Sequence, residues 1–136
     1  MEIKDSYTFK EMELAYVAGF FDGEGYIGVR FRGREKSIQL VIEAYNTIGT
    51  SIQFIASILG GTVHKRSDSK VENKPIYRWS LTGSRAAFAL CMLLPYLVIK
   101  EERARLGIEC VIASKERRLE ILEEMHKLNK KGVVIY

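Results

Sequence analysis

The sequence has 136 residues, of which 47% are hydrophobic and 28% charged, with a net charge of +4, and we expect a single domain spanning residues 1–136. The start of the chain is charged and lacks the apolar stretch of a secretory signal, and the longest apolar run, residues 86–99, is too short to cross a bilayer. The composition therefore argues against a secreted or membrane protein and favours the cytoplasm or an organellar matrix.

The first part of the chain predicts a helix followed by a β-hairpin. Residues 8–22 have helical spacing, Thr8 is a suitable N-cap, and Glu11 completes a capping box. Residues 26–34 alternate between apolar and cationic side chains, which is typical of a half-buried strand with one cationic face. Residues 38–45 form the returning strand.

The rest of the chain repeats this order and then ends in helices. Ser84 caps one apolar helix, which Pro95 ends. The sequence of helix, hairpin, helix, hairpin and helices predicts an α+β domain with an antiparallel sheet. The elements expected here are a helix over 47–59, strands over 62–66 and 75–82, and helices over 84–94, 100–114 and 115–128.

The two cysteines, Cys91 and Cys110, both lie in apolar stretches of the sequence. We expect them to be reduced and to lie in the core. They do not form a CxxC pair, so the sequence does not predict a zinc or redox site.

The first helix ends in a glycine-rich segment, VAGFFDGEG, at residues 17–25. Ala15, Gly19 and Gly23 fall four residues apart on one stripe, where small side chains let a second helix approach closely. Each glycine in a helix costs roughly 1 kcal/mol relative to alanine, and a tight helix–helix contact would offset that cost. An ordinary helix with a glycine-rich end is the alternative, but it accounts for Gly25 and not for Gly19.

Residues 17–25 resemble, nearly position by position, the nine-residue LAGLIDADG signature of a family of homing endonucleases. Val17 replaces the leading leucine, and Glu24 replaces the second aspartate. The predicted αββαββα order is also similar to this family, in which the antiparallel sheet is saddle-shaped, and here an extra C-terminal helix follows. The resemblance implies a site-specific DNA endonuclease that makes a metal-dependent cut in both strands of a long pseudo-palindromic site.

The single copy of the motif indicates a two-fold homodimer in which two such helices meet. Ala15, Gly19, Asp22 and Gly23 are the expected interface residues, and the resemblance implies that Asp22 links helix termini by hydrogen bonds. The resemblance also implies that Glu24 binds the catalytic metal together with the backbone carbonyl of Gly23. Oxygen ligands favour Mg²⁺, which Mn²⁺ can replace. A solvated acid in a turn is the alternative for Glu24.

Two further residues are implied by the resemblance to act in catalysis. Lys100 lies in a segment similar to the one that carries the active-site lysine of the family, where it would stabilise developing charge or hold the attacking water. Asn46 corresponds to a position that often carries a water-orienting amide. A surface lysine at the start of a helix is the alternative for Lys100.

A basic surface is predicted for the middle of the chain. Between Arg30 and Arg78 there are nine lysine and arginine residues and four acidic ones, a balance of +5, against −1 (twelve and thirteen) elsewhere. Such an excess suits a polyanion, here double-stranded DNA, although a solvated basic strand face is the alternative. Strands in a major groove can read base edges, and lysines can bind phosphates. The base-reading candidates are Arg30, Arg32, Arg34, Gln39, Glu43, His64, Arg66 and Arg78, and the phosphate-binding candidates are Lys36, Lys65, Lys70 and Lys74.

Glu43 is an acid on a surface expected to face phosphates. It could accept a hydrogen bond from a cytosine amino group, or the strand register could differ from the expected one. Two other functions also remain open for the chain as a whole. One is a non-cleaving RNA maturase or DNA-binding regulator on the same fold, which would need neither Glu24 nor Lys100. The other is a plain interaction domain that only dimerises.

Overall fold

The structure is a computed structural model that describes residues 7–33, 37–66 and 75–131. Within these ranges the chain forms a four-stranded antiparallel sheet and five α-helices. The elements are α1 (Phe9–Glu24), β1 (Gly25–Arg32), β2 (Ser37–Asn46), α2 (Gly49–Leu59), β3 (Thr62–Arg66), β4 (Ile76–Thr82), α3 (Gly83–Leu93), the short 3-10 helix η1 (Leu94–Tyr96), α4 (Glu101–Ile112) and α5 (Lys115–Lys131). The predicted α+β class and element order are confirmed.

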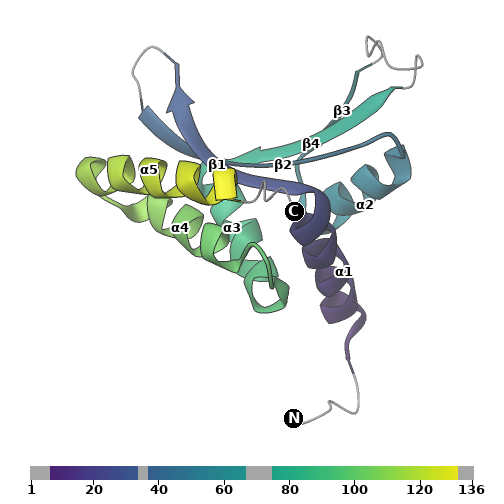
Figure 1. Ribbon diagram of the computed structural model, residues 1–136. Helices are drawn as coiled ribbons and strands as arrows, with labels where there is room; N and C mark the ends of the chain where they lie inside the picture. Colours follow the sequence, from purple (N-terminus) through teal and green to yellow (C-terminus); the bar gives the residue numbers. More distant parts are fainter. Residues whose placement is uncertain (1–6, 34–36, 67–74, 132–136) are drawn as a thin grey trace.

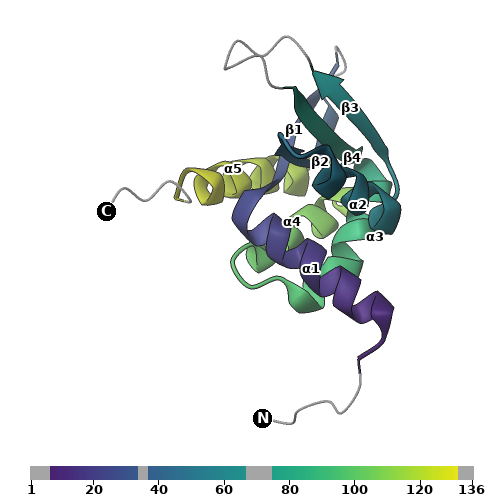
Figure 2. The ribbon, with the colours of Figure 1, turned by 90° about the vertical axis from the view of Figure 1, so that its right-hand side faces the viewer.

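The strands lie in the order β1-β2-β4-β3, so the two hairpins join through β2 and β4 at the centre of the sheet. Figure 1 shows the sheet as a saddle whose two hairpins rise at either side, with the helices packed beneath it. The second view confirms that the helices lie on one side of the sheet (Figure 2). One face of the sheet is therefore covered, and the other is open.

The covered face holds the hydrophobic core. Because strand side chains alternate between faces, Ile27 and Val29 of β1 and Trp79 of β4 all point toward the helices and are buried. The Trp79 ring packs edge-on against Phe21 of α1, with the ring centroids 5.7 Å apart, and its indole N–H donates to the Gly60 carbonyl at 2.7 Å. These contacts fix the end of α1 against the centre of the sheet.

Helix α1 begins where the sequence predicts and ends two residues later than expected. The Thr8 hydroxyl accepts a hydrogen bond from the Glu11 amide at 3.1 Å, which confirms the N-cap. The helix continues through Gly23 to Glu24 and stops at Gly25. Glu24 therefore lies in the last turn of α1 and leads directly into β1.

Three details of the α-helical part differ from the predictions. Helix α3 begins at Gly83, which has φ +62°, and Ser84 lies inside the helix instead of capping it. Helix α5 extends to Lys131 instead of ending near residue 128. Cys110 is buried as expected, but Cys91 lies on the exposed side of α3, so its place in the core was predicted wrongly. None of the described helices combines the length and the hydrophobicity that a membrane span requires.

Candidate nucleic-acid interface and active site

The open face of the sheet carries the described residues that were predicted to read DNA. Arg30 pairs with Gln39 across β1 and β2, and His64 pairs with Arg78 across β3 and β4. Since partners in register lie on the same side of a sheet, the predicted sharing of one face is confirmed. The candidates on this open face are Arg30, Arg32, Gln39, Glu43, His64, Arg66 and Arg78. Arg34, Lys36, Lys70 and Lys74 lie outside the described residues.

Lys65 does not share the open face. It pairs with Tyr77, which points to the same side of β4 as the buried Trp79. The strand register therefore does not support the predicted contact of Lys65 with phosphates. The open face also holds two aromatic residues that the sequence analysis missed, Tyr26 and Tyr45, which are 38% and 41% exposed. Extending the alternation from Arg30 back along β1 would have identified Tyr26.

Glu43 also lies on the open face of the sheet, between Tyr26 of β1 and Ser80 of β4, yet it is only 5% exposed. Its Oε2 atom accepts hydrogen bonds from Nε of Arg78 at 2.9 Å and from Nη2 of the same guanidinium. The Tyr45 hydroxyl donates to that oxygen at 3.4 Å, and Nη2 of Arg30 lies 3.7 Å from it. The register was predicted correctly, and Glu43 is engaged by protein donors of its own chain.

The exposed carboxylate of Glu24 lies where the end of α1 meets the end of β2. Gly25 pairs with Ala44, and this pairing brings Asn46 beside Glu24. The Asn46 amide nitrogen donates to Oε2 of Glu24 at 3.1 Å, while its Oδ1 accepts from the Ile48 amide at 2.8 Å. Two of the three predicted catalytic residues are therefore in direct contact. The Asn46 side chain is held at both ends.

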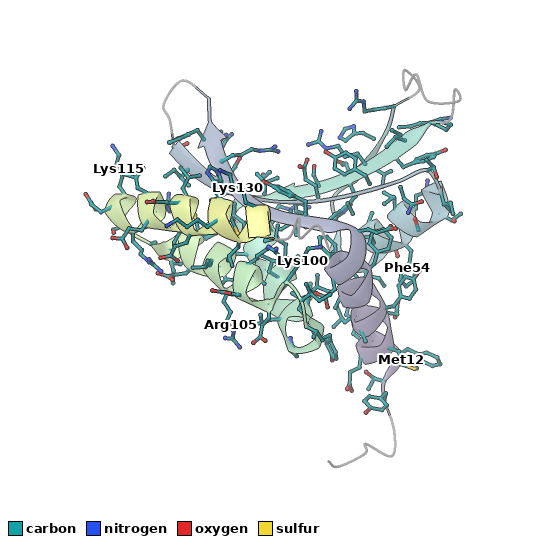
Figure 3. All side chains as sticks on the ribbon, in the orientation of Figure 1. Met12, Phe54, Lys100, Arg105, Lys115 and Lys130 are labelled. Atoms are coloured by element: carbon teal, nitrogen blue, oxygen red, sulfur yellow. The ribbon has the colours of Figure 1, made fainter. Side chains whose placement is uncertain are left out.

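Lys100 lies beside the C-terminal end of α1 (Figure 3). Its ammonium group donates to the backbone carbonyls of Phe21 and Asp22. A lysine ammonium has three donors, so one N–H remains for another partner. Burial lowers the pKa of Lys100 below its usual value, the Arg103 guanidinium lowers it further, and the Asp22 carboxylate opposes both effects. Lys100, the third predicted catalytic residue, therefore contacts the last turn of α1, to which Glu24 also belongs.

Asp22 ties the end of α1 to the start of α4. Its carboxylate accepts hydrogen bonds from the backbone amides of Val98, Ile99 and Lys100 at 2.9, 3.1 and 3.0 Å. The linking of helix termini that the resemblance implies is therefore found within one chain. Asp22 was predicted to lie in the dimer interface, but both of its carboxylate oxygens accept hydrogen bonds inside the chain.

Replacing Asp22 with alanine should destabilise the fold. The three amides would lose a charged acceptor, and because they are partly exposed water would replace it in part, so we expect a loss of about 1–3 kcal/mol in the free energy of unfolding. Urea denaturation at a fixed protein concentration measures this change. Asp22→Asn, which keeps one acceptor oxygen, should lose less. Equal midpoints for Asp22→Ala and the unaltered protein would contradict the role given to this carboxylate.

The small-residue stripe of α1 is not covered by any other described part of the chain. Ala15, Gly19 and Gly23 are exposed, and a Cβ atom added at either glycine would have no described atom within 4 Å outside the backbone of its own helix and its chain neighbours. Met12 and Tyr16 on the same helix are 49% and 58% exposed. Figure 2 shows α1 in front of α3 and α4, with its near side uncovered. The stripe is therefore available to a second helix, and its use in a dimer stays a prediction.

The residues around Glu24 fit a hard divalent cation. The carboxylate is exposed, and its Oε1 atom accepts no hydrogen bond from the described residues. The C-terminal end of α1 adds a partial negative charge at the same place. Oxygen donors of this kind suit Mg²⁺. Within the described ranges no group of three or more histidine, cysteine, aspartate or glutamate side chains could hold a metal, so a site here needs further ligands.

The fold of this chain is similar to those of solved homing endonucleases. No protein-family profile and no curated protein matches the sequence. Solved structures do match. I-CvuI in complex with its target in the presence of Ca is 24% identical with a TM-score of 0.74, covering 88% of this chain and 83% of that chain. I-CvuI with the I-CreI target in the presence of Mg is 25% identical, with a TM-score of 0.72 and coverage of 88% and 82%.

Two further structures extend this likeness. The archaeal intron-encoded homing endonuclease I-Vdi141I, complexed with DNA, is 14% identical with a TM-score of 0.70 and coverage of 93% and 88%. The LAGLIDADG homing endonuclease I-SmaMI, bound to cleaved DNA, is 18% identical with a TM-score of 0.61, covering 98% of this chain but 47% of that chain. The chain therefore has the LAGLIDADG homing endonuclease fold, as residues 17–25 predict.

Proposed function

We propose that this chain is a site-specific DNA endonuclease, which acts as a homodimer and cuts both strands of a long pseudo-palindromic site with a divalent metal. One observation carries the proposal. The exposed Glu24 carboxylate, held by Asn46, lies where the bare stripe of α1 meets the open basic face of the sheet. The matched I-CvuI and I-Vdi141I structures are complexes with DNA, which supports a DNA substrate. A DNA substrate also favours the cytoplasm or an organellar matrix.

The open face would supply the affinity for DNA. Among the described residues it has four arginines and one acid, Glu43, so its formal charge is +3 before histidine is counted. Two adjacent hairpins of a twisted sheet can enter a major groove, where arginine contacts guanine and glutamine contacts adenine. Neutralising phosphates would make the affinity fall steeply with salt concentration.

The homodimer would be built on α1. Close packing at Gly19 and Gly23 brings two copies of α1 together at a two-fold axis, and each copy adds one open face. The coverage of I-SmaMI supports this arrangement, because the present chain spans about half the length of that protein. The same symmetry places two Glu24 carboxylates near each other, and their mutual repulsion favours the binding of cations.

At the end of α1, Glu24 and the Gly23 carbonyl would hold Mg²⁺, which Mn²⁺ can replace. The bound cation would activate water and stabilise the charge that develops on the phosphate oxygens. Asn46 fixes the rotamer of Glu24 through its amide, and the remaining N–H of Lys100 can donate to a phosphate oxygen. Because burial lowers the pKa of Lys100, its ammonium group should lose its proton at a lower pH than an ordinary lysine.

A plasmid library that carries randomised inserts tests the proposal. We expect double-strand cuts in Mg²⁺, no cuts in EDTA, and recovery when Mg²⁺ is added in excess. The uncut fraction on agarose gels is the readout, and heparin retention across a salt gradient gives the accompanying affinity. Salt-sensitive retention without cutting in Mg²⁺ or Mn²⁺ would instead support a non-cleaving nucleic-acid-binding module on this fold. Absence of any retention at low salt would leave only the interaction-domain alternative.

A further inference from the structure

Glu43 and Arg78 form an ion pair on the open face of the sheet. Glu43 is the one buried charged side chain among the described residues, and it lies on the open face, where solvated residues are expected. Arg78 comes from a different hairpin, 35 residues further along the chain, and its side chain is 35% exposed. An acid here lowers the positive charge of a surface meant for DNA, so its presence needs a reason.

The contacts between the two side chains leave one edge of the guanidinium free. An arginine guanidinium is planar and has five N–H groups, one on Nε and two on each Nη. Glu43 accepts from Nε–H and from one Nη2–H, which lie on the side edge of this plane. The end edge, formed by Nη1 and the second N–H of Nη2, accordingly points away from Glu43. This end edge matches O6 and N7 of guanine, the bidentate contact that arginine makes in a major groove.

We propose that Glu43 is a positioning residue that orients Arg78 to read a guanine in each half-site, and that Glu43 itself contacts no base. The inference rests on the proposed function. A side chain fixed in its bound conformation loses less conformational freedom on binding, so orientation by Glu43 would sharpen the choice of base. Arg30 lies 3.7 Å from the same Glu43 oxygen, but its side chain is 51% exposed, so Glu43 holds it more loosely than Arg78.

Burial and contacts distinguish this role from direct contact with cytosine. One carboxylate oxygen of Glu43 already receives donors from Arg78 and Tyr45. The Oε1 atom accepts no hydrogen bond from the described residues, but the side chain as a whole is only 6% exposed. Reaching a base would require Glu43 to release Arg78, which would leave a guanidinium without its partner.

Base preferences measured at every position of the site test the proposal. The dimer binds a randomised duplex library in Ca²⁺, and the bound fraction is sequenced for the unaltered protein, Glu43→Gln, Arg78→Lys and the double variant. We expect one symmetric pair of positions with a guanine preference of about 5- to 150-fold, the range of a good bidentate contact. Arg78→Lys should remove this preference, and Glu43→Gln should reduce it several-fold at the same positions. The double variant should match Arg78→Lys.

Control variants and a folding measurement separate an effect of Glu43 on base preference from an effect on folding. Glu123→Gln, a matched change at an exposed residue of α5, should leave every preference unchanged. Thermal melting checks that Glu43→Gln folds, and Glu43→Asp, which keeps the charge, should restore part of the preference. An unchanged guanine preference in Glu43→Gln, or a lost cytosine preference at another position, would overturn the positioning role alone. Failure of the unaltered protein to enrich any sequence would overturn the proposed function, and this inference with it.

Discussion

Glu24→Gln should abolish cleavage and leave DNA binding almost unchanged. Glutamine keeps the size of the side chain and an oxygen that can accept from Asn46, but it removes the charge that attracts a divalent cation. We expect the rate of cutting to fall by about three orders of magnitude or more, corresponding to a loss of about 4 kcal/mol of transition-state stabilisation. Affinity should persist because the arginines of the open face are untouched.

The measurement uses a site selected by the unaltered protein. Single-turnover cutting in Mg²⁺ gives the rate, and gel shifts in Ca²⁺ give the affinity. Glu13→Gln, the same substitution about three turns earlier on α1, is the matched control and should cut normally. A Glu24→Gln protein that cuts at the normal rate would remove Glu24 from the metal site. A protein that no longer binds would show that the carboxylate acts in assembly of the complex.

Gly19→Leu should convert the dimer to monomers. A Cβ atom added at Gly19 has no described atom within 4 Å outside the backbone of α1 and its chain neighbours, so we expect the fold of each subunit to tolerate the substitution. Across a two-fold axis two leucines would enter the same close contact, and overpacking costs about 1–3 kcal/mol for each. The dissociation constant of the dimer should therefore rise on the order of a hundredfold or more. Because cutting needs both subunits, activity should fall with the dimer.

Light scattering across a dilution series measures the assembly, and circular dichroism confirms that the subunit still folds. Cys91→Leu adds bulk at another exposed position, on α3, and should leave the dimer intact. Gly19→Ala should have an intermediate effect because it adds a single methyl group. If Gly19→Leu scatters light as a dimer at the same concentrations as the unaltered protein, then the stripe of α1 is not the interface.

The order of elements, the start of α1 and the sharing of one sheet face by Arg30, Gln39 and Arg78 follow from local patterns. Alternation with a period of two determines which strand residues share a face, and the Thr8 cap acts over three residues. Each of these patterns lies within a single helix or strand, so it can be read without knowing how the chain folds back on itself. The motif at residues 17–25 likewise predicted the fold that the solved homing endonucleases share with this chain.

The contacts that build the candidate site join residues far apart in the sequence. Lys100 donates to carbonyls 78 and 79 residues earlier, and the Glu24 carboxylate meets Asn46 across 22 residues. The exposure of Cys91 depends on which elements pack against α3, and the burial of Glu43 depends on the side chains around it on the sheet. Neither set of neighbours can be deduced from the amino-acid composition. Side-chain patterns therefore predicted the surfaces of this protein. The packing of helices against the sheet determined which of its polar groups are free to meet a ligand and which are held by another side chain.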